Sequence, residues 1–316
     1  MWRSVRISTM ALLVTSAAMT IAAMPAATAS AAPAPNAPTD APAGGSVSFM
    51  VVDRDTGEIR AERDAHAQYR SASLVKLLIA LDYFETRGPD VEIPPEDRAL
   101  LEPMLRASDD QAASTLWVRE GWELIVERMV HRLGLTDTEP PADRRIWGYT
   151  ATSAADIARI YEYLLADAAP SAREFILGAL REATRCAADG RDQYFGIPSA
   201  VDEPWAVKQG WSGYGDVEPG QECAEATTAR NDGELATPES SPAVRDAAIR
   251  AQVAEGPEID LTRPAMHTSG TIGAADDTIM VVLSLHAEGT SYEDSAERLT
   301  AITRVLYGAN CPSCAS

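Results

Sequence analysis

Ser73 and Lys76 are the residues of this sequence best suited to nucleophilic chemistry. They stand three positions apart at the start of an apolar run, Leu74 to Phe84, whose leucines recur at the spacing of one helix face. Residues three apart lie on the same face of a helix, so the lysine amine can reach the serine hydroxyl. An amine beside an apolar face is desolvated, and a desolvated amine can take the proton of a serine. The spacing therefore predicts a nucleophile and its base, although a capped core helix would show the same pattern.

Two further short patterns follow along the chain. Ser108-Asp109-Asp110 precedes a predicted helix, and Lys208-Gln209-Gly210-Trp211 lies at a predicted strand with a glycine where a substrate must come close. Each also has an ordinary interpretation, because Ser108 can be a helix N-cap and Lys208 can be a lysine on an edge strand. The order of the three patterns favours chemistry, since S-x-x-K, S-D-N and K-T-G form a set in serine acyl-transfer enzymes and each has a counterpart here in that order.

From Val47 to Tyr307 the sequence resembles the superfamily of class A β-lactamases and D-alanyl-D-alanine peptidases, the penicillin-recognising serine hydrolases. The resemblance rests on the three motifs, on their order, and on a layout of hairpin, helical lobe, closing strands and closing helix. It implies acyl transfer, in which a serine attacks an amide or β-lactam carbonyl and forms an acyl-enzyme. The expected substrate is a small molecule or peptide, either a β-lactam or a peptidoglycan-type peptide, and no cofactor is expected.

The resemblance also implies a role for each motif residue. Ser73 would be the nucleophile and Lys76 its base, while Ser108 would relay a proton toward the leaving nitrogen. Lys208 would offer positive charge to the substrate carboxylate, and the backbone N–H groups of Ser73 and Trp211 would form the oxyanion hole. The other motif residues are expected to bind substrate: Asp110, Gln209 and Gly210.

Two positions depart from the pattern of that family, and a third motif matches it only in part. Asp110 replaces an asparagine, and its carboxylate beside Lys76 should favour the ammonium form and so work against a base. Gln209 replaces a threonine, which removes a hydroxyl from the carboxylate pocket. Glu139, in the run Glu-Pro-Pro-Ala-Asp, is a possible deacylation base, although a proline-rich turn is the more ordinary interpretation. These departures support an alternative function, a catalytically weak or inactive protein of the cell envelope that uses the fold for binding or scaffolding.

Strand patterns at both ends of the chain, with helix patterns between them, predict an α/β fold of the α+β kind. Terminal strands need partners, so both ends should form one antiparallel sheet with flanking helices and an inserted all-helical lobe at about residues 77–186. A hairpin of strands is expected at 47–53 and 58–62, and further strands at 205–210, 266–272 and 278–286. Helices are expected at 74–84, 97–106, 111–119, 122–133, 154–165, 172–185 and 292–307.

The first residues predict export. Arg3 and Arg6 precede an apolar run, and small residues up to Ala31 fit a cleavage site, so 1–31 is expected to be a signal peptide of a secreted protein without a lipid anchor. A Pro/Ala-rich linker, 32–45, would follow. The hydrolase-like domain is expected at 46–310, with an acidic insertion at about 215–264 and a short tail at 311–316.

The charge, cysteine and histidine content of the chain indicates which partners and disulfide bonds to expect. The formal net charge is −20, and loss of the two signal-peptide arginines would take it to about −22, which disfavours nucleic acid as a partner. Four cysteines in an exported chain favour disulfides, and all three pairings are open. A bond between Cys186 and Cys223 would tie a helical region to the later loop, and Cys311 with Cys314 would form a tail disulfide. The histidines lack metal-ligand spacing, so no metal is expected, and the protein is expected to be a monomer.

Overall fold

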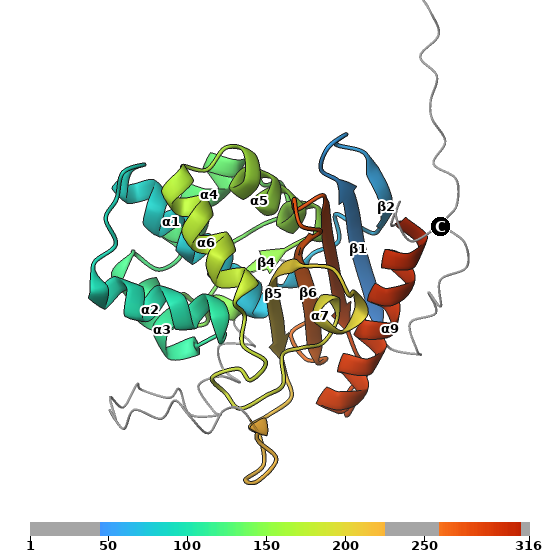
Figure 1. The fold of residues 1–316 in the computed structure, drawn as a ribbon. Coiled ribbons are helices and arrows are strands. Elements are labelled where there is room, and N and C mark those ends of the chain that lie inside the picture. The colour runs from blue at the N-terminus through green and yellow to red at the C-terminus, as the bar shows by residue number, and fades with distance from the viewer. Residues whose placement is uncertain (1–44, 225–258, 311–316) are drawn as a thin grey trace, which may run out of the picture. The chain divides into compact units, whose positions relative to one another are not determined.

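One antiparallel sheet is built from both ends of the chain (Figure 1). The computed structural model describes residues 45–224 and 259–310. The strand order is β2-β1-β7-β6-β5, and the first strand pairs along its whole length with the last, so the predicted fold class is confirmed. The five strands are β1 (Ser46–Asp53), β2 (Ile59–Arg63), β5 (Trp205–Ser212), β6 (Ala265–Ile272) and β7 (Thr278–Leu285).

Helices pack on both faces of this sheet. Within β7, Ile279 and Val281 belong to a core shared with the helical lobe, whereas Met280 and Val282 belong to a second core shared with α9. Because side chains alternate between the faces of a strand, a strand covered on both faces is apolar throughout. The helices are α1 (Lys76–Arg87), α2 (Pro95–Arg106), α3 (Asp110–Arg119), α4 (Leu124–Leu133), α5 (Ala154–Ala166), α6 (Pro170–Arg181), α7 (Ile197–Ala200) and α9 (Tyr292–Asn310).

Local chemistry explains where several helices begin and end. Gly88, at φ 93°, ends α1, and the Ser153 side chain caps α5 by accepting from the Asp156 N–H at 3.1 Å. Helix α6 ends four residues before the predicted end at residue 185. The chain leaves the helix there because the Thr184 N–H and the Gln193 side-chain amide both donate to the Arg106 carbonyl, at 3.0 and 2.8 Å.

Short elements that the sequence did not predict hold the loops beside the sheet. Strand β3 (Tyr69–Arg70) pairs with β4 (Ala151–Thr152), and two 3₁₀ turns, η1 (Ala72–Val75) and η2 (Trp147–Tyr149), lie next to that pair along the chain. Runs of two to four residues carry too little periodicity to be recognised in a sequence.

Of the predicted disulfides, the one between Cys186 and Cys223 is present. The tail cysteines, the predicted signal peptide, nearly all of the linker and residues 225–258 of the predicted insertion lie outside the described residues. Within residues 45–224 and 259–310, no helix combines the length and the apolar character needed to cross a bilayer.

Candidate active site

The turn η1 carries Ser73 and leads directly into α1, which begins at Lys76. The Lys76 Nζ donates to the Ser73 Oγ at 2.9 Å, so the two side chains meet as the i, i+3 spacing predicts. Both residues are buried, with 7% of Ser73 and none of Lys76 exposed. A buried amine that contacts a serine hydroxyl is the arrangement a serine nucleophile needs.

Ser108 joins this pair to Lys208. The Lys76 Nζ donates to the Ser108 carbonyl oxygen at 2.6 Å and to its Oγ at 3.3 Å, and the Lys208 Nζ donates to the same Oγ at 2.7 Å. The three sequence motifs therefore meet in one hydrogen-bonded chain, which we call the serine–lysine cluster (Ser73, Lys76, Ser108 and Lys208). The structure brings these four predicted residues together.

Backbone strain flanks the cluster. Ala72, at φ 46°, directly precedes the candidate nucleophile, and Ser108 itself has φ 56°. Left-handed backbone costs free energy in residues other than glycine, so it persists only where the surroundings impose it. Here the Ser71 N–H donates to the Thr150 carbonyl at 2.8 Å and holds the turn in place.

The two lysines have perturbed acidities. Burial lowers the pKa of Lys76, while the charge of Asp110 and its hydrogen bond act in the opposite direction. Burial also lowers the pKa of Lys208 well below its ordinary value, and the nearby charge of Lys76 lowers it further. Two ammonium groups that share one hydroxyl repel each other, so the pair favours a state in which one amine is neutral. A neutral amine in this position can act as a base.

Asp110 lies at the open side of the cluster. Its Oδ1 is 2.5 Å from the Lys76 Nζ, yet 71% of its side chain is exposed while that of Lys76 is not exposed at all. The neighbouring Asp109 has a different role, since it caps α3 by accepting from the Ala112 N–H at 2.9 Å. The predicted contact between Asp110 and Lys76 is therefore present, and it is an ion pair.

Gly210 brings strand β5 against the nucleophile turn. A Cβ at this position would lie 3.1 Å from the Ser71 carbonyl oxygen and 3.3 Å from the Ser73 nitrogen, so a larger residue would push the strand away. Trp211, the next residue, turns its indole to the Asp189 carboxylate, which accepts from the indole Nε1 at 2.9 Å. The close approach places the backbone of both predicted oxyanion-hole residues in one region.

Two predicted site residues do not join the cluster through their side chains. The buried amide of Gln209 donates to the carbonyl oxygens of Phe195 and Gln193, at 2.5 and 3.3 Å, on the face of β5 opposite Lys208. Glu139 is exposed, and its carboxylate accepts from the Gln68 side chain at 3.0 Å. The contacts found for these two side chains among the described residues do not include the serine–lysine cluster.

Arg70 is a buried residue that no pattern in the sequence indicates as important. Its guanidinium donates to the Ser212 Oγ at 2.6 Å, to the Asp260 carbonyl at 2.7 Å and to the Arg263 carbonyl. It thereby connects β3, the strand before η1, to the end of β5 and to the segment that leads into β6.

His267 lies beside Arg70. Its Nε2 is 2.9 Å from the Arg70 carbonyl oxygen, and burial lowers the pKa of His267 to about 3. This neutral imidazole supports the site and is not part of it.

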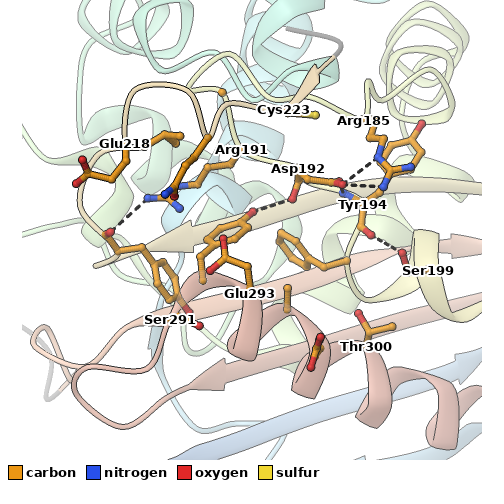
Figure 2. A pocket seen from close by; sticks show the side chains of 18 of the residues that line it. Arg185, Arg191, Asp192, Tyr194, Ser199, Glu218, Cys223, Ser291, Glu293 and Thr300 are labelled. Atoms are coloured by element: carbon orange, nitrogen blue, oxygen red, sulfur yellow. Dashed lines mark hydrogen bonds and ion pairs between the residues drawn. The ribbon is translucent and has the colours of Figure 1, made fainter.

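A large pocket lies in another region of the molecule. The α9 pocket, about 890 Å³ in volume, is lined by segments 185–199 and 214–223 and by the first turns of α9 (Figure 2). Figure 2 shows Arg185 paired with Asp192 and the Ser199 hydroxyl bonded to the backbone of Tyr194. The lining includes none of the serine–lysine cluster. The part of the chain that the structure describes holds no group of three or more side chains suited to bind a metal ion.

No family model matches the sequence. Curated relatives named "Putative lipoprotein LppW" occur in Mycobacterium tuberculosis and Mycobacterium bovis and are 39% identical over 177 residues. The match covers 54% of this chain and 55% of the relative, so the chain spans about half the length of the curated relatives it matches.

Solved structures with the same architecture include PBP-A, with a TM-score of 0.57, 13% identity, and coverage of 86% of this chain and 92% of that chain. A β-lactamase from Sphaerobacter thermophilus has a TM-score of 0.56 and 15% identity, covering 84% and 92%. A class A β-lactamase from Mycobacterium abscessus has a TM-score of 0.54 and 16% identity, covering 84% and 94%. The chain has the fold of the class A β-lactamases and PBP-A, as its sequence motifs led us to expect.

Proposed function

We propose that this protein is an extracytoplasmic serine acyl-transferase or hydrolase that acts on β-lactam or peptidoglycan-type amides through an acyl-enzyme on Ser73. The observation that carries the proposal is the 2.9 Å contact between the Ser73 Oγ and a fully buried Lys76 amine whose pKa burial lowers. Burying an amine costs free energy, so a fold that keeps one beside a hydroxyl supports a chemical role for the pair. A serine nucleophile requires such a base.

The first half-reaction can be written with these residues. The neutral Lys76 amine takes the Ser73 proton as the Oγ attacks the substrate carbonyl, and negative charge develops on the carbonyl oxygen near the backbone N–H groups of Ser73 and Trp211. The carbon–nitrogen bond then breaks, and the leaving nitrogen receives a proton through Ser108, whose Oγ bonds both lysines. Lys208 is the group proposed to attract a substrate carboxylate. The product is an ester on Ser73, which a second nucleophile must cleave.

Three observations support a location outside the cytoplasm. The curated relatives are named as a lipoprotein, residues 1–31 have the pattern of a signal peptide, and Cys186 and Cys223 form a disulfide. Disulfides persist in oxidising compartments and are rare in the cytosol. Substrates of the peptidoglycan type occur in the same compartment as such a protein.

The ion pair between Asp110 and Lys76 favours a second candidate, a non-catalytic protein that binds such ligands or acts as a scaffold. A carboxylate 2.5 Å from the amine stabilises the ammonium form, which cannot accept a proton from Ser73. In that case the serine–lysine cluster would still recognise a carboxylate-bearing ligand through Lys208, without forming a covalent bond.

Covalent labelling separates the two candidates. The full chain is incubated with a fluorescent penicillin, and the adduct is located by intact-protein and peptide mass spectrometry. Wild type and Ser71→Ala should carry one adduct on Ser73, and Ser73→Ala should carry none, because only the second variant lacks the nucleophile. Ser71 is a matched control, since it is buried two residues away in the same turn. Absence of an adduct in wild type from about pH 6 to about pH 10 would reject catalysis and leave the binding protein.

A further inference from the structure

The indole of Trp147 covers the amine of Lys76. The Lys76 Nζ lies 4.9 Å from the ring centroid, within the range of a cation–π contact. The indole Nε1 donates to the Ser114 Oγ at 3.1 Å, and Ser114 follows Asp110 by four residues on α3. One aromatic ring therefore connects the loop before β4 to the helix that carries Asp110, directly over the candidate base.

The turn that holds this indole is fixed against the nucleophile turn. A Cβ on Gly148 would lie 3.7 Å from the Ala72 Cα, so the two backbones are in contact. The Ser71 N–H donates to the Thr150 carbonyl at 2.8 Å, and the Thr150 hydroxyl donates to the Trp147 carbonyl at 2.8 Å. These contacts fix the backbone of the turn, and the hydrogen bond from the indole Nε1 to the Ser114 Oγ holds the ring itself.

Protein groups closely surround the Lys76 amine. Four polar atoms surround it at 2.5 to 3.3 Å: the Ser73 Oγ, the Ser108 carbonyl oxygen, the Ser108 Oγ and the Asp110 Oδ1. The ammonium form of lysine has three N–H groups and the neutral amine has two, so in either form the four acceptors leave no N–H group free to bind a water. The indole face occupies a further side. A water that used this amine as its base would have to displace one of these groups.

The acids of the same loop are engaged elsewhere. Residues 135–150 contain three carboxylates, and each has a partner away from the cluster. Asp137 accepts from Ser153 at 2.7 Å, Glu139 from Gln68 at 3.0 Å, and Asp143 from Arg145 at 2.9 Å. In this fully described loop an aromatic ring, and no carboxylate, faces the candidate base.

We propose that Trp147 is a specificity-determining residue that keeps water from the Ser73 acyl-enzyme and so makes that intermediate long-lived. This inference rests on the proposed function. Hydrolysis of the ester needs a water oxygen to form a bond to the acyl carbon, a base to take its proton, and the Ser73 Oγ to leave and recover a proton. Trp147 denies the water both space beside Lys76 and access to its amine. In the first half-reaction the amine takes its proton from the Ser73 Oγ, which already contacts it at 2.9 Å, so the indole does not obstruct that step.

The test measures how fast the adduct is lost, separately from how fast it forms. Wild type, Trp147→Ala, Trp147→Phe and Trp122→Ala are labelled with penicillin, excess reagent is removed, and the Ser73 adduct is followed by intact mass. Trp122 is a matched control, because it is also half-buried and its ring faces the Arg144 guanidinium at 5.6 Å instead of Lys76. We expect Trp147→Ala to shorten the lifetime of the adduct at least about tenfold, with Trp147→Phe and Trp122→Ala close to wild type.

The outcomes distinguish this inference from the proposed function. An adduct that forms on Ser73 but persists equally long in Trp147→Ala would overturn the role of Trp147 alone. Equal shortening in Trp122→Ala would show general loosening of the loop and would also overturn it. A merely structural indole would slow formation of the adduct, whereas the proposal places the effect on its loss. No adduct in any variant would reject the proposed function and this inference with it.

Discussion

The serine–lysine cluster and the α9 pocket are opposites in size and in chemistry. The cluster consists of four buried side chains, whereas the pocket has a volume of about 890 Å³ (Figure 2). In the cluster, burial lowers the pKa of two lysines toward neutrality, where an amine can exchange protons. In the pocket, burial raises the pKa of Tyr214 to about 12 and that of Tyr292 well above its ordinary value, so both phenols stay protonated. Burial acts in both regions, but only in the cluster does it create a group poised for proton transfer.

Backbone conformation separates the two regions in the same way. Positive φ angles beside the cluster belong to Ala72 and Ser108, for which such angles cost free energy. Positive φ angles beside the pocket belong to Gly190, Gly196 and Gly215, for which they cost little. Strain that the fold maintains at Ala72, next to the nucleophile, and at Ser108, within the cluster, indicates the reactive region together with perturbed acidity better than cavity volume does.

Removal of the base from the cluster is expected to have the largest effect on the rate of acylation, and a matched change in the α9 pocket is expected to have none. Lys76→Met keeps the length of the stem and should slow acylation of Ser73 by about 10² to 10⁴-fold, the usual contribution of a general base. The control is Arg304→Ala, which should leave the rate unchanged. Arg304 is an exposed residue of the α9 pocket, and the hydrogen bond described for its guanidinium is to the Ser199 carbonyl. Stopped-flow fluorescence with a reporter penicillin measures both. Equal loss of rate in the two variants would contradict the assignment of chemistry to the cluster.

Removal of the disulfide tests the pocket as a structural region. Cys186 and Cys223 are separated by 37 residues, and loss of a cross-link of that span should lower the free energy of unfolding by about 3 to 4 kcal/mol. The paired change Cys186→Ser with Cys223→Ser is compared with wild type by denaturant unfolding. The folded fraction should acylate at the wild-type rate, because the contacts of Lys76 with Ser73 and Ser108 do not include either cysteine. A folded but unreactive double variant would show that the pocket side controls the cluster.

The sequence predicted what depends on local periodicity and motif order. Alternation and helical spacing were sufficient to identify β1, β7 and the contact of Ser73 with Lys76, because each depends on neighbours within one turn or one strand. The alternation of side chains along a strand also predicts that Gln209 lies on the face opposite Lys208, as it does, and so argues against Gln209 as a site residue.

Other features depend on where irregular loops pack in three dimensions. Trp147 and Glu139 belong to the same loop, and a proline-rich turn does not specify which side chain reaches the base. Arg70 contacts residues more than 140 positions away, and nothing in its neighbourhood in the sequence marks it as buried. Such contacts are set by the tertiary fold, so no short window of sequence contains them.

The smallest expected effect, and the only gain of rate in acylation, belongs to Asp110→Asn. The charge of Asp110 raises the pKa of Lys76 against the effect of burial. Without that charge the pKa of Lys76 falls, the neutral amine persists to lower pH, and the acylation profile should move to lower pH. Near neutral pH the larger neutral fraction should raise the acylation rate, by a factor on the order of ten.

Asp109→Asn is the matched control for this change. It removes a neighbouring charge that also raises the pKa of Lys76. The Asp109 side chain bonds the N-terminus of α3 and not the Lys76 amine, and an asparagine at this position retains the N-cap. The shift in the pH–rate profile should therefore be clearly smaller than for Asp110→Asn. If the two profiles coincide with that of wild type, Asp110 does not control the protonation of Lys76, and the ion pair loses its value as an argument for an inactive protein. If Asp110→Asn alone gains activity, the carboxylate at the open side restrains a site that is otherwise assembled for acyl transfer.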